Sequence, residues 1–110
     1  YEEHLYVASM EGLISCIDTR TGEQAWEERL ESSSGRNEVW SSSTMTGDGL
    51  MYVSNQTGDT FVFRPNPRSY NQVSRNSINE HTNSSAIIGN GEVFIRTHKA
   101  LWCFAEHASP

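Results

Sequence analysis

Few residues of this sequence could carry chemistry, and their spacing matches no familiar catalytic or metal-binding pattern. Asp18 could act as a general base, and Trp40 and Trp102 could stack on a planar cofactor. Packing in a core is the more ordinary role of a strand tryptophan, and we expect it for both indoles. The histidines show neither an HExxH pattern nor i, i+4 pairing, so we expect them in loops or on the surface. They are His4, His81, His98 and His107. We therefore predict no catalytic, cofactor-binding or metal-binding residue in this chain.

Other chemistries have as little support. No G-x-S-x-G nucleophile elbow occurs, and residues 47–49 (Gly-Asp-Gly) are followed by no lysine, which indicates a turn rather than a phosphate-binding loop. Four carboxylates follow the first strands as an acidic patch. They are Glu23, Glu27, Glu28 and Glu31. A solvated sheet edge is their expected role, with binding of calcium or of a basic partner as the alternative.

The two cysteines, Cys16 and Cys103, lie inside apolar segments, Ser-Cys-Ile and Trp-Cys-Phe. Neither belongs to a CxxC motif or has a histidine at metal-ligand spacing. We expect two structural thiols, buried as small hydrophobic side chains, rather than a disulfide. The cysteines therefore do not indicate a redox compartment.

Length and charge limit the classes of function. With 110 residues, the chain is one small domain or a piece of a larger protein, and its start at Tyr1 without methionine or signal peptide favours a processed or excised piece. The formal net charge is −6, with 14 acidic against 8 basic residues, so no basic face is available for nucleic acid. No apolar run approaches the roughly 18 to 20 residues that a membrane-spanning helix needs.

The elements that would position these residues begin with a hairpin. Residues 5–8 and 13–17 are rich in aliphatic, aromatic and β-branched side chains, and Met10-Glu11-Gly12 lies between them where a tight turn is expected. Residues 18–22 (Asp-Thr-Arg-Thr-Gly) predict a second turn, and residues 23–26 resume a strand. Residues 27–30 could take one helical turn instead.

The same pattern recurs along the chain. Tyr6-Val7 and Gly12 reappear 46 residues later as Tyr52-Val53 and Gly58, and Phe94-Ile95 repeats the pair once more. A period of this size suits a four-stranded propeller blade, which takes about 40 to 50 residues. We therefore predict an all-β chain: a segment of a β-propeller.

Turn signals divide the chain into blades. Asp48-Gly49 and Asn90-Gly91 are hairpin turns, each of which joins an expected inner strand, residues 39–45 or 84–88, to a second strand. Further strands are expected at residues 60–63, 70–75 and 101–104. The prediction is ten strands, grouped three, four and three, in about two and three-quarter four-stranded antiparallel blades. Blade one covers residues 1–38 and lacks its inner strand, blade two covers 39–80, and blade three covers 81–110 and lacks its outer strand.

Residues 16–26 resemble the tryptophan-docking motif of pyrroloquinoline-quinone-type β-propeller repeats, A-x-D-x-x-T-G-x-x-x-W, with cysteine in the alanine position. The matching residues are Cys16, Asp18, Thr21, Gly22 and Trp26. The resemblance implies a structural role for them, in which Asp18 braces a turn and Trp26 packs across neighbouring blades. The second blade has Arg64 and Gln72 in place of the aspartate and the tryptophan.

The second half, including residues 76–80, 84–87, 94–97 and 101–104, resembles the C-terminal end of secreted bacterial quinone-binding-like propellers, such as outer-membrane-assembly lipoproteins. This resemblance implies a periplasmic or secreted location and a last blade closed by another strand of the full chain. Quinoprotein dehydrogenases of the same superfamily need a catalytic aspartate, calcium ligands, a tryptophan floor and, in many members, adjacent cysteines. No Cys-Cys pair occurs here.

We therefore expect a non-catalytic propeller scaffold for protein–protein interaction in an extracytoplasmic compartment. Its expected partners are another protein or the remaining blades, with Arg20, Trp40, Arg68 and Tyr70 as candidate contacts. One alternative is part of a dehydrogenase that uses pyrroloquinoline quinone and calcium through residues outside this segment. A second is a structural module that self-assembles through open edge strands.

Overall fold

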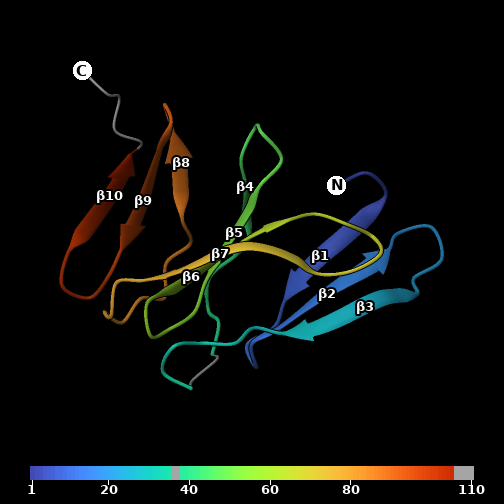
Figure 1. Cartoon of the computed structure of the whole chain (residues 1–110), viewed down its shortest axis with the longest axis horizontal. Coiled ribbons are helices and arrows are strands. Elements are labelled where there is room, and N and C mark those ends of the chain that lie inside the picture. The colour runs from blue at the N-terminus through green and yellow to red at the C-terminus, as the bar shows by residue number, and fades with distance from the viewer. Residues whose placement is uncertain (36–37, 106–110) are drawn as a thin grey trace.

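Ten strands form three antiparallel sheets in the described part of the computed structural model, residues 1–35 and 38–105 (Figure 1). The sheet orders are β1-β2-β3, β4-β5-β6-β7 and β10-β9-β8, and we call these sheets blades one, two and three. The strands are β1 (His4–Ala8), β2 (Leu13–Asp18), β3 (Gln24–Arg29), β4 (Thr44–Met45), β5 (Met51–Ser54), β6 (Asp59–Arg64), β7 (Asn71–Ser77), β8 (Ile87–Gly89), β9 (Glu92–Arg96) and β10 (Leu101–Ala105). The predicted all-β class and the grouping of three, four and three strands are confirmed.

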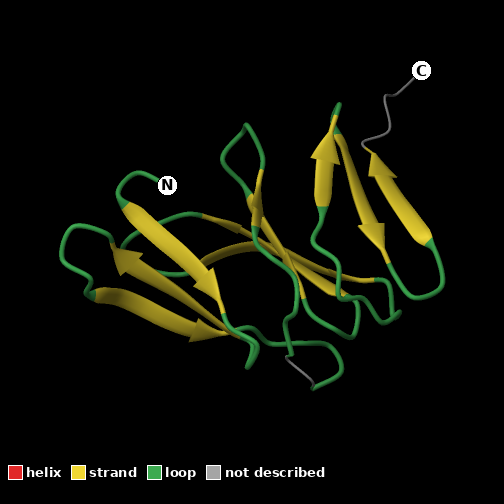
Figure 2. Cartoon of the chain, turned by 180° about the vertical axis from the view of Figure 1, so that it is seen from behind, coloured by secondary structure: helices red, strands yellow, loops and turns green. Residues whose placement is uncertain are grey.

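The blades stand side by side with blade two in the middle, as both ribbon views show (Figure 2). No helix in the described residues is long and apolar enough to cross a membrane. The repeat of 46 residues has a structural meaning in this arrangement. Leu30 N donates to Gly12 O in blade one, and Ile78 N donates to Gly58 O in blade two, at 2.9 and 3.0 Å. Each glycine therefore accepts a hydrogen bond from the chain that leaves the outer strand of its own blade.

Three local expectations were wrong in detail. The helical turn considered for residues 27–30 does not form, because β3 continues to Arg29 and Glu27 and Glu28 pair with β2. The inner strand of blade two covers only Thr44–Met45, because the preceding residues bond elsewhere: Ser41 Oγ donates to Ser54 O at 2.8 Å. In blade three the inner strand begins at Ile87, because Ser84 Oγ instead donates to Arg96 O at 2.7 Å.

The main apolar core lies between blades one and two. Alternate residues of β2 (Ile14 and Cys16) and of β6 (Phe61 and Phe63) are fully buried there. The cluster is completed by Tyr6 of β1, by Met51 and Val53 of β5, and by Leu30 and Val39 of the connection between the blades. Burial of one face of each sheet therefore holds these two blades together.

The two cysteines differ in exposure, contrary to expectation. Cys16 is buried in this core, whereas Cys103 is exposed on β10, and neither forms a disulfide. The apolar pattern around Cys103 predicted a covered strand. In the described chain the face of blade three that carries Cys103 is open: Ile87, which lies in the same row of the sheet on β8, is 66% exposed.

Candidate interaction site

Cys16 and Trp26 of the tryptophan motif lie at the contact between blades one and two, which we call a seam. The Trp26 indole is half-buried, and its Nε1 donates to the carbonyl of Asn66, in the β6–β7 loop, at 2.7 Å. Its ring lies 6.1 Å from Tyr6 and 5.9 Å from Tyr70, both tilted. Tyr6, Cys16 and Trp26 pair across β1, β2 and β3, which puts them on one face of the sheet. Trp26 therefore connects blade one directly to a loop of blade two.

The remaining motif residues hold the turn that precedes β3. Asp18 Oδ1 accepts a hydrogen bond from Arg20 N at 2.8 Å, and Thr21 Oγ1 accepts one from Glu23 N at 3.2 Å. Gly22 has φ = 75°, a conformation that costs a residue without Cβ little, and its N–H donates to Asp18 O. The hydrogen bond from Arg20 N, with the nearby guanidinium, holds the pKa of Asp18 below its usual range. This environment favours an ionised turn brace over a proton-accepting base.

The four predicted partner contacts lie in different surroundings. Arg20 is exposed and forms ion pairs with Glu3 and Asp18, both at 3.5 Å. The side chain of Trp40 is 54% exposed in the connection ahead of β4, and Arg68 is exposed in the β6–β7 loop. The structure thus gathers no single patch from them.

Tyr70 belongs to the seam rather than to the open surface. Its ring is half-buried against Phe63 and Trp26, and its hydroxyl donates to Gln72 Oε1 at 2.8 Å. Burial, with the charge of Glu28, raises the pKa of Tyr70 to about 12. Only part of this side chain is available to a partner.

We expect Trp26→Ala to lower the free energy of unfolding by about 2 kcal/mol, less than full burial would give, because the indole is only half-buried. Trp26→Phe keeps most of the ring area but loses the hydrogen bond to Asn66, and should cost about 1 kcal/mol. Urea unfolding of both variants measures the two contributions. Equal losses for alanine and phenylalanine would contradict a packing role for the ring.

The other face of blade two borders an open cavity, which we call the interblade groove. It has a volume of about 570 Å³ and lies between blades two and three. A second cavity of about 530 Å³ adjoins it and shares Tyr52, Val93 and Phe104 with it. The apolar lining of the groove comes from both blades: Leu50, Tyr52, Val62, Val73, Ile78, Val93, Ile95 and Phe104.

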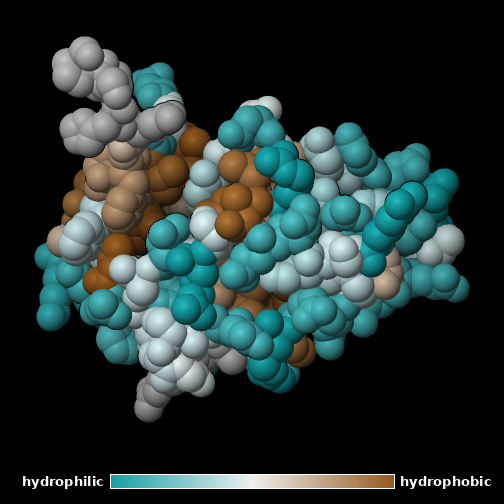
Figure 3. All heavy atoms as spheres, viewed as in Figure 1, coloured by the Kyte–Doolittle hydropathy of each residue, from teal (hydrophilic) through white to brown (hydrophobic). Residues whose placement is uncertain are grey.

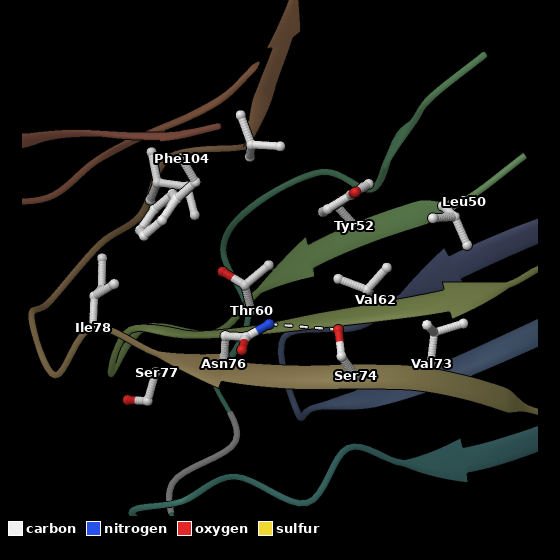
Figure 4. A pocket seen from close by; sticks show the side chains of 12 residues that line it. Leu50, Tyr52, Thr60, Val62, Val73, Ser74, Asn76, Ser77, Ile78 and Phe104 are labelled. Carbon is white, nitrogen blue, oxygen red and sulfur yellow. Dashed lines mark hydrogen bonds between the residues drawn. The ribbon is translucent and has the colours of Figure 1, made fainter. Parts of the chain in front are cut away.

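The lining side chains converge from opposite sides (Figure 4). Tyr52, Val62 and Val73 project from the sheet of blade two, and Phe104 approaches from blade three. Ile78 lies in the segment that leaves β7. Polar groups lie along β7 between the apolar side chains of Ile78 and Val73, and there Asn76 Nδ2 donates to Ser74 Oγ at 3.4 Å. In the space-filling view, apolar surface shows over blade three and near the middle of the molecule, while most of blade one is polar (Figure 3). This arrangement can accept apolar side chains and a few hydrogen bonds.

The sequence predicted the strands of this groove but not the groove. A signal was present, because β6 carries apolar residues on both of its faces: Phe61 and Phe63 alternate with Val62. A strand with two apolar faces needs a packing partner on each face of its sheet. Blade one covers the face of Phe61 and Phe63 closely, and blade three covers that of Val62 only in part.

A polar cluster lies beside blade three. Glu80 Oε1 accepts hydrogen bonds from Thr97 Oγ1 at 2.7 Å and from Trp102 Nε1 at 3.1 Å, and these bonds hold the pKa of Glu80 below its usual range. The rings of His81 and His98 stack at 6.1 Å. Within the described residues, no three His, Cys, Asp or Glu side chains are grouped so that they could hold a metal ion.

The fold defines a class: an all-β chain whose antiparallel sheets are arranged as part of a β-propeller. Among solved structures, the chain is similar to the crystal structure of BamB from Moraxella catarrhalis, with a TM-score of 0.70 and 14% sequence identity. The match covers 97% of this chain and 34% of that one, so the chain spans about a third of its length. At this identity the likeness shows the fold alone. Comparison with family models and with curated proteins finds no match.

Proposed function

We propose that the chain is part of a non-catalytic β-propeller scaffold that binds a protein partner through the interblade groove. The observation that carries this proposal is the apolar lining contributed by two blades around one open cavity. Apolar pockets with a few polar groups at their rim suit the anchoring side chains of a partner. Because the groove lies between two sheets, its shape depends on the rigid packing of both.

We propose an extracytoplasmic location for this scaffold. The sequence resemblance to secreted quinone-binding-like propellers supports it, and so does the structural likeness to BamB. The tryptophan motif at the first seam fits the same family of repeats, with Trp26 reaching the next blade.

Displayed random peptides selected on the immobilised chain provide a probe for the groove. We expect selected peptides to carry apolar anchors, and Val73→Asp to weaken their binding at least about tenfold, or about 1.4 kcal/mol. Val73 is 52% exposed at the groove, so the change should leave the fold intact. Fluorescence anisotropy with a labelled peptide measures the dissociation constant.

The matched control is Val7→Asp. Val7 is a 38% exposed strand valine of blade one that does not line the groove, and its replacement should leave the affinity unchanged. Equal loss in both variants would refute the groove as the binding site. Sustained dye reduction by the protein with pyrroloquinoline quinone, calcium and an alcohol or sugar would refute the non-catalytic assignment.

A further inference from the structure

Two histidines that are far apart in the sequence lie together in the fold. His81 belongs to the connection between β7 and β8, and His98 belongs to the β9–β10 turn. Their rings lie 6.1 Å apart and are nearly parallel, at 16°. Both residues are exposed, so water and ions reach both imidazoles. The spacing of the histidines in the sequence did not indicate this pair, because the two segments meet only in the folded chain.

The backbone under the histidine pair is held in place. His98 N donates to His81 O at 2.9 Å, which joins the two segments directly. Thr82 N donates to Gln56 O at 3.0 Å, which ties the first segment to the β5–β6 turn of blade two. Thr82 and Thr97, the neighbours of the two histidines, are both buried. The two imidazoles therefore project from an ordered support, and bringing them to one ligand costs little backbone entropy.

The distance between the two rings suits a shared metal ion. An imidazole nitrogen binds such an ion at about 2.0 to 2.1 Å, and it lies about 1.1 Å from the centre of its own ring. Two rings that bind one ion at a right angle therefore have centres about 4.5 Å apart, and two that bind from opposite sides about 6.4 Å. The observed 6.1 Å falls within this range. Because both side chains are exposed, each can change rotamer to direct a nitrogen at the ion.

The chemistry of the pair selects the class of ion. Imidazole suits Cu²⁺, Ni²⁺ and Zn²⁺, whereas Mg²⁺ and Ca²⁺ prefer oxygen ligands. The charges beside the pair are mixed: Lys99 follows His98 and opposes a cation, and the carboxylate of Glu80 precedes His81 and favours one. The net charge of the chain, −6, favours the approach of cations over a longer range.

We propose that His81 and His98 together bind one divalent cation of the copper, nickel and zinc group, with water in its remaining coordination positions. Closed structural sites have four protein ligands, so a two-histidine site leaves positions at which a partner protein can add a ligand. The bound ion would connect the β9–β10 turn of blade three to the segment that is tied to blade two. This proposal goes beyond the scaffold function, because neither histidine lines the interblade groove.

Calorimetric titration of the full chain, without a polyhistidine tag, tests the site. We use Ni²⁺ as the probe, because the exposed thiol of Cys103 can reduce Cu²⁺. We expect His81→Ala and His98→Ala each to weaken Ni²⁺ binding at least about tenfold. The double variant should bind no more weakly than either single variant, because one remaining imidazole cannot chelate. Both substitutions keep the backbone hydrogen bond between the two segments.

The matched control is His4→Ala, in blade one, where the ring Nδ1 lies 3.1 Å from Glu2 O. Its affinity for Ni²⁺ should equal that of the unmodified chain. Mg²⁺ at the same concentration should not compete with Ni²⁺. Equal weakening by all three single substitutions, or losses at His81 and His98 that add in the double variant, would overturn the shared site.

Urea unfolding tests whether the ion links the two segments. An ion that binds only the folded chain shifts the folding equilibrium about a hundredfold at a concentration of one hundred times its dissociation constant. We expect Ni²⁺ to raise the urea midpoint of the unmodified chain and not that of His98→Ala. An unchanged midpoint in the unmodified chain would overturn the proposal. Val73→Asp should keep its affinity for Ni²⁺, so failure of the groove and failure of the histidine pair are distinguishable.

Discussion

Replacing Gly58 with alanine should lower the free energy of unfolding by about 3 to 5 kcal/mol, which combines backbone strain with a steric clash. Gly58 has φ = 98°, which residues with a Cβ adopt only under strain. A Cβ at this position would lie 2.6 Å from Glu80 O and 2.8 Å from Glu80 N. Both are backbone atoms of the segment that connects blades two and three, and neither can rotate away. Urea unfolding measures the loss.

Gly49→Ala is the matched control. Gly49 lies in the preceding turn with φ = 86°, but nothing approaches within 4 Å of the position of its Cβ. We therefore expect Gly49→Ala to lower the free energy of unfolding by about 1 kcal/mol, because this variant has the backbone strain but not the clash. Similar losses for both variants would show that the connection at Glu80 yields to the new methyl group, and that close packing of this segment on the β5–β6 turn contributes little.

The position of Gly58 also explains how far the sequence predicts the fold. The repeat of Tyr-Val and Gly at an interval of 46 residues identified equivalent turns, and both glycines accept the same kind of hydrogen bond from the departing chain. The strands with alternating or continuous apolar residues were predicted nearly to their ends. The inner strands were not, because Ser41 and Ser84 satisfy their hydrogen bonds outside the ladder. Which acceptor such a serine bonds depends on residues that are distant in the sequence.

The candidate site was less predictable than the fold. The sequence identified Trp26 from its motif, but the partner of its indole is the carbonyl of Asn66, 40 residues away, which no local pattern specifies. Tyr70 was expected as a partner contact, and no local pattern indicated that its ring also packs beside Trp26. The groove depends on how closely two sheets approach each other. Side-chain identity along one strand, such as Val62 in β6, indicates that a face needs cover but not how complete the cover is.

The loop that connects blades one and two is held in place by one buried carboxylate. Asp59, fully buried at the start of β6, accepts hydrogen bonds from Ser33 N at 2.6 Å and Ser33 Oγ at 2.7 Å. Asn55 Nδ2 donates a longer bond, at 3.4 Å. We expect Asp59→Ala to lower the free energy of unfolding by about 3 kcal/mol, because these donors lose their acceptor in a buried site. Denaturant unfolding at neutral pH measures the loss, and Asp48→Ala, at an exposed turn, should have a much smaller effect.

The same carboxylate should make stability depend on pH. Burial alone would raise the pKa of Asp59, but the hydrogen bonds from Ser33, Ser77 and Asn55 outweigh it and hold the pKa below its ordinary value. The unfolded chain therefore binds this proton first as pH falls. The contribution of Asp59 is complete above the ordinary aspartate pKa of about 4 and is lost as pH falls through the folded value. The difference in unfolding free energy between the unmodified chain and Asp59→Asn should accordingly shrink from pH 6 toward pH 2, by roughly 1.4 kcal/mol for each pH unit between the two pKa values. A constant difference over that range would mean that Asp59 has the same pKa in the folded and the unfolded chain, so that its hydrogen bonds do not favour the ionised form. A difference that grows as pH falls would mean that Asp59 is protonated in the folded chain.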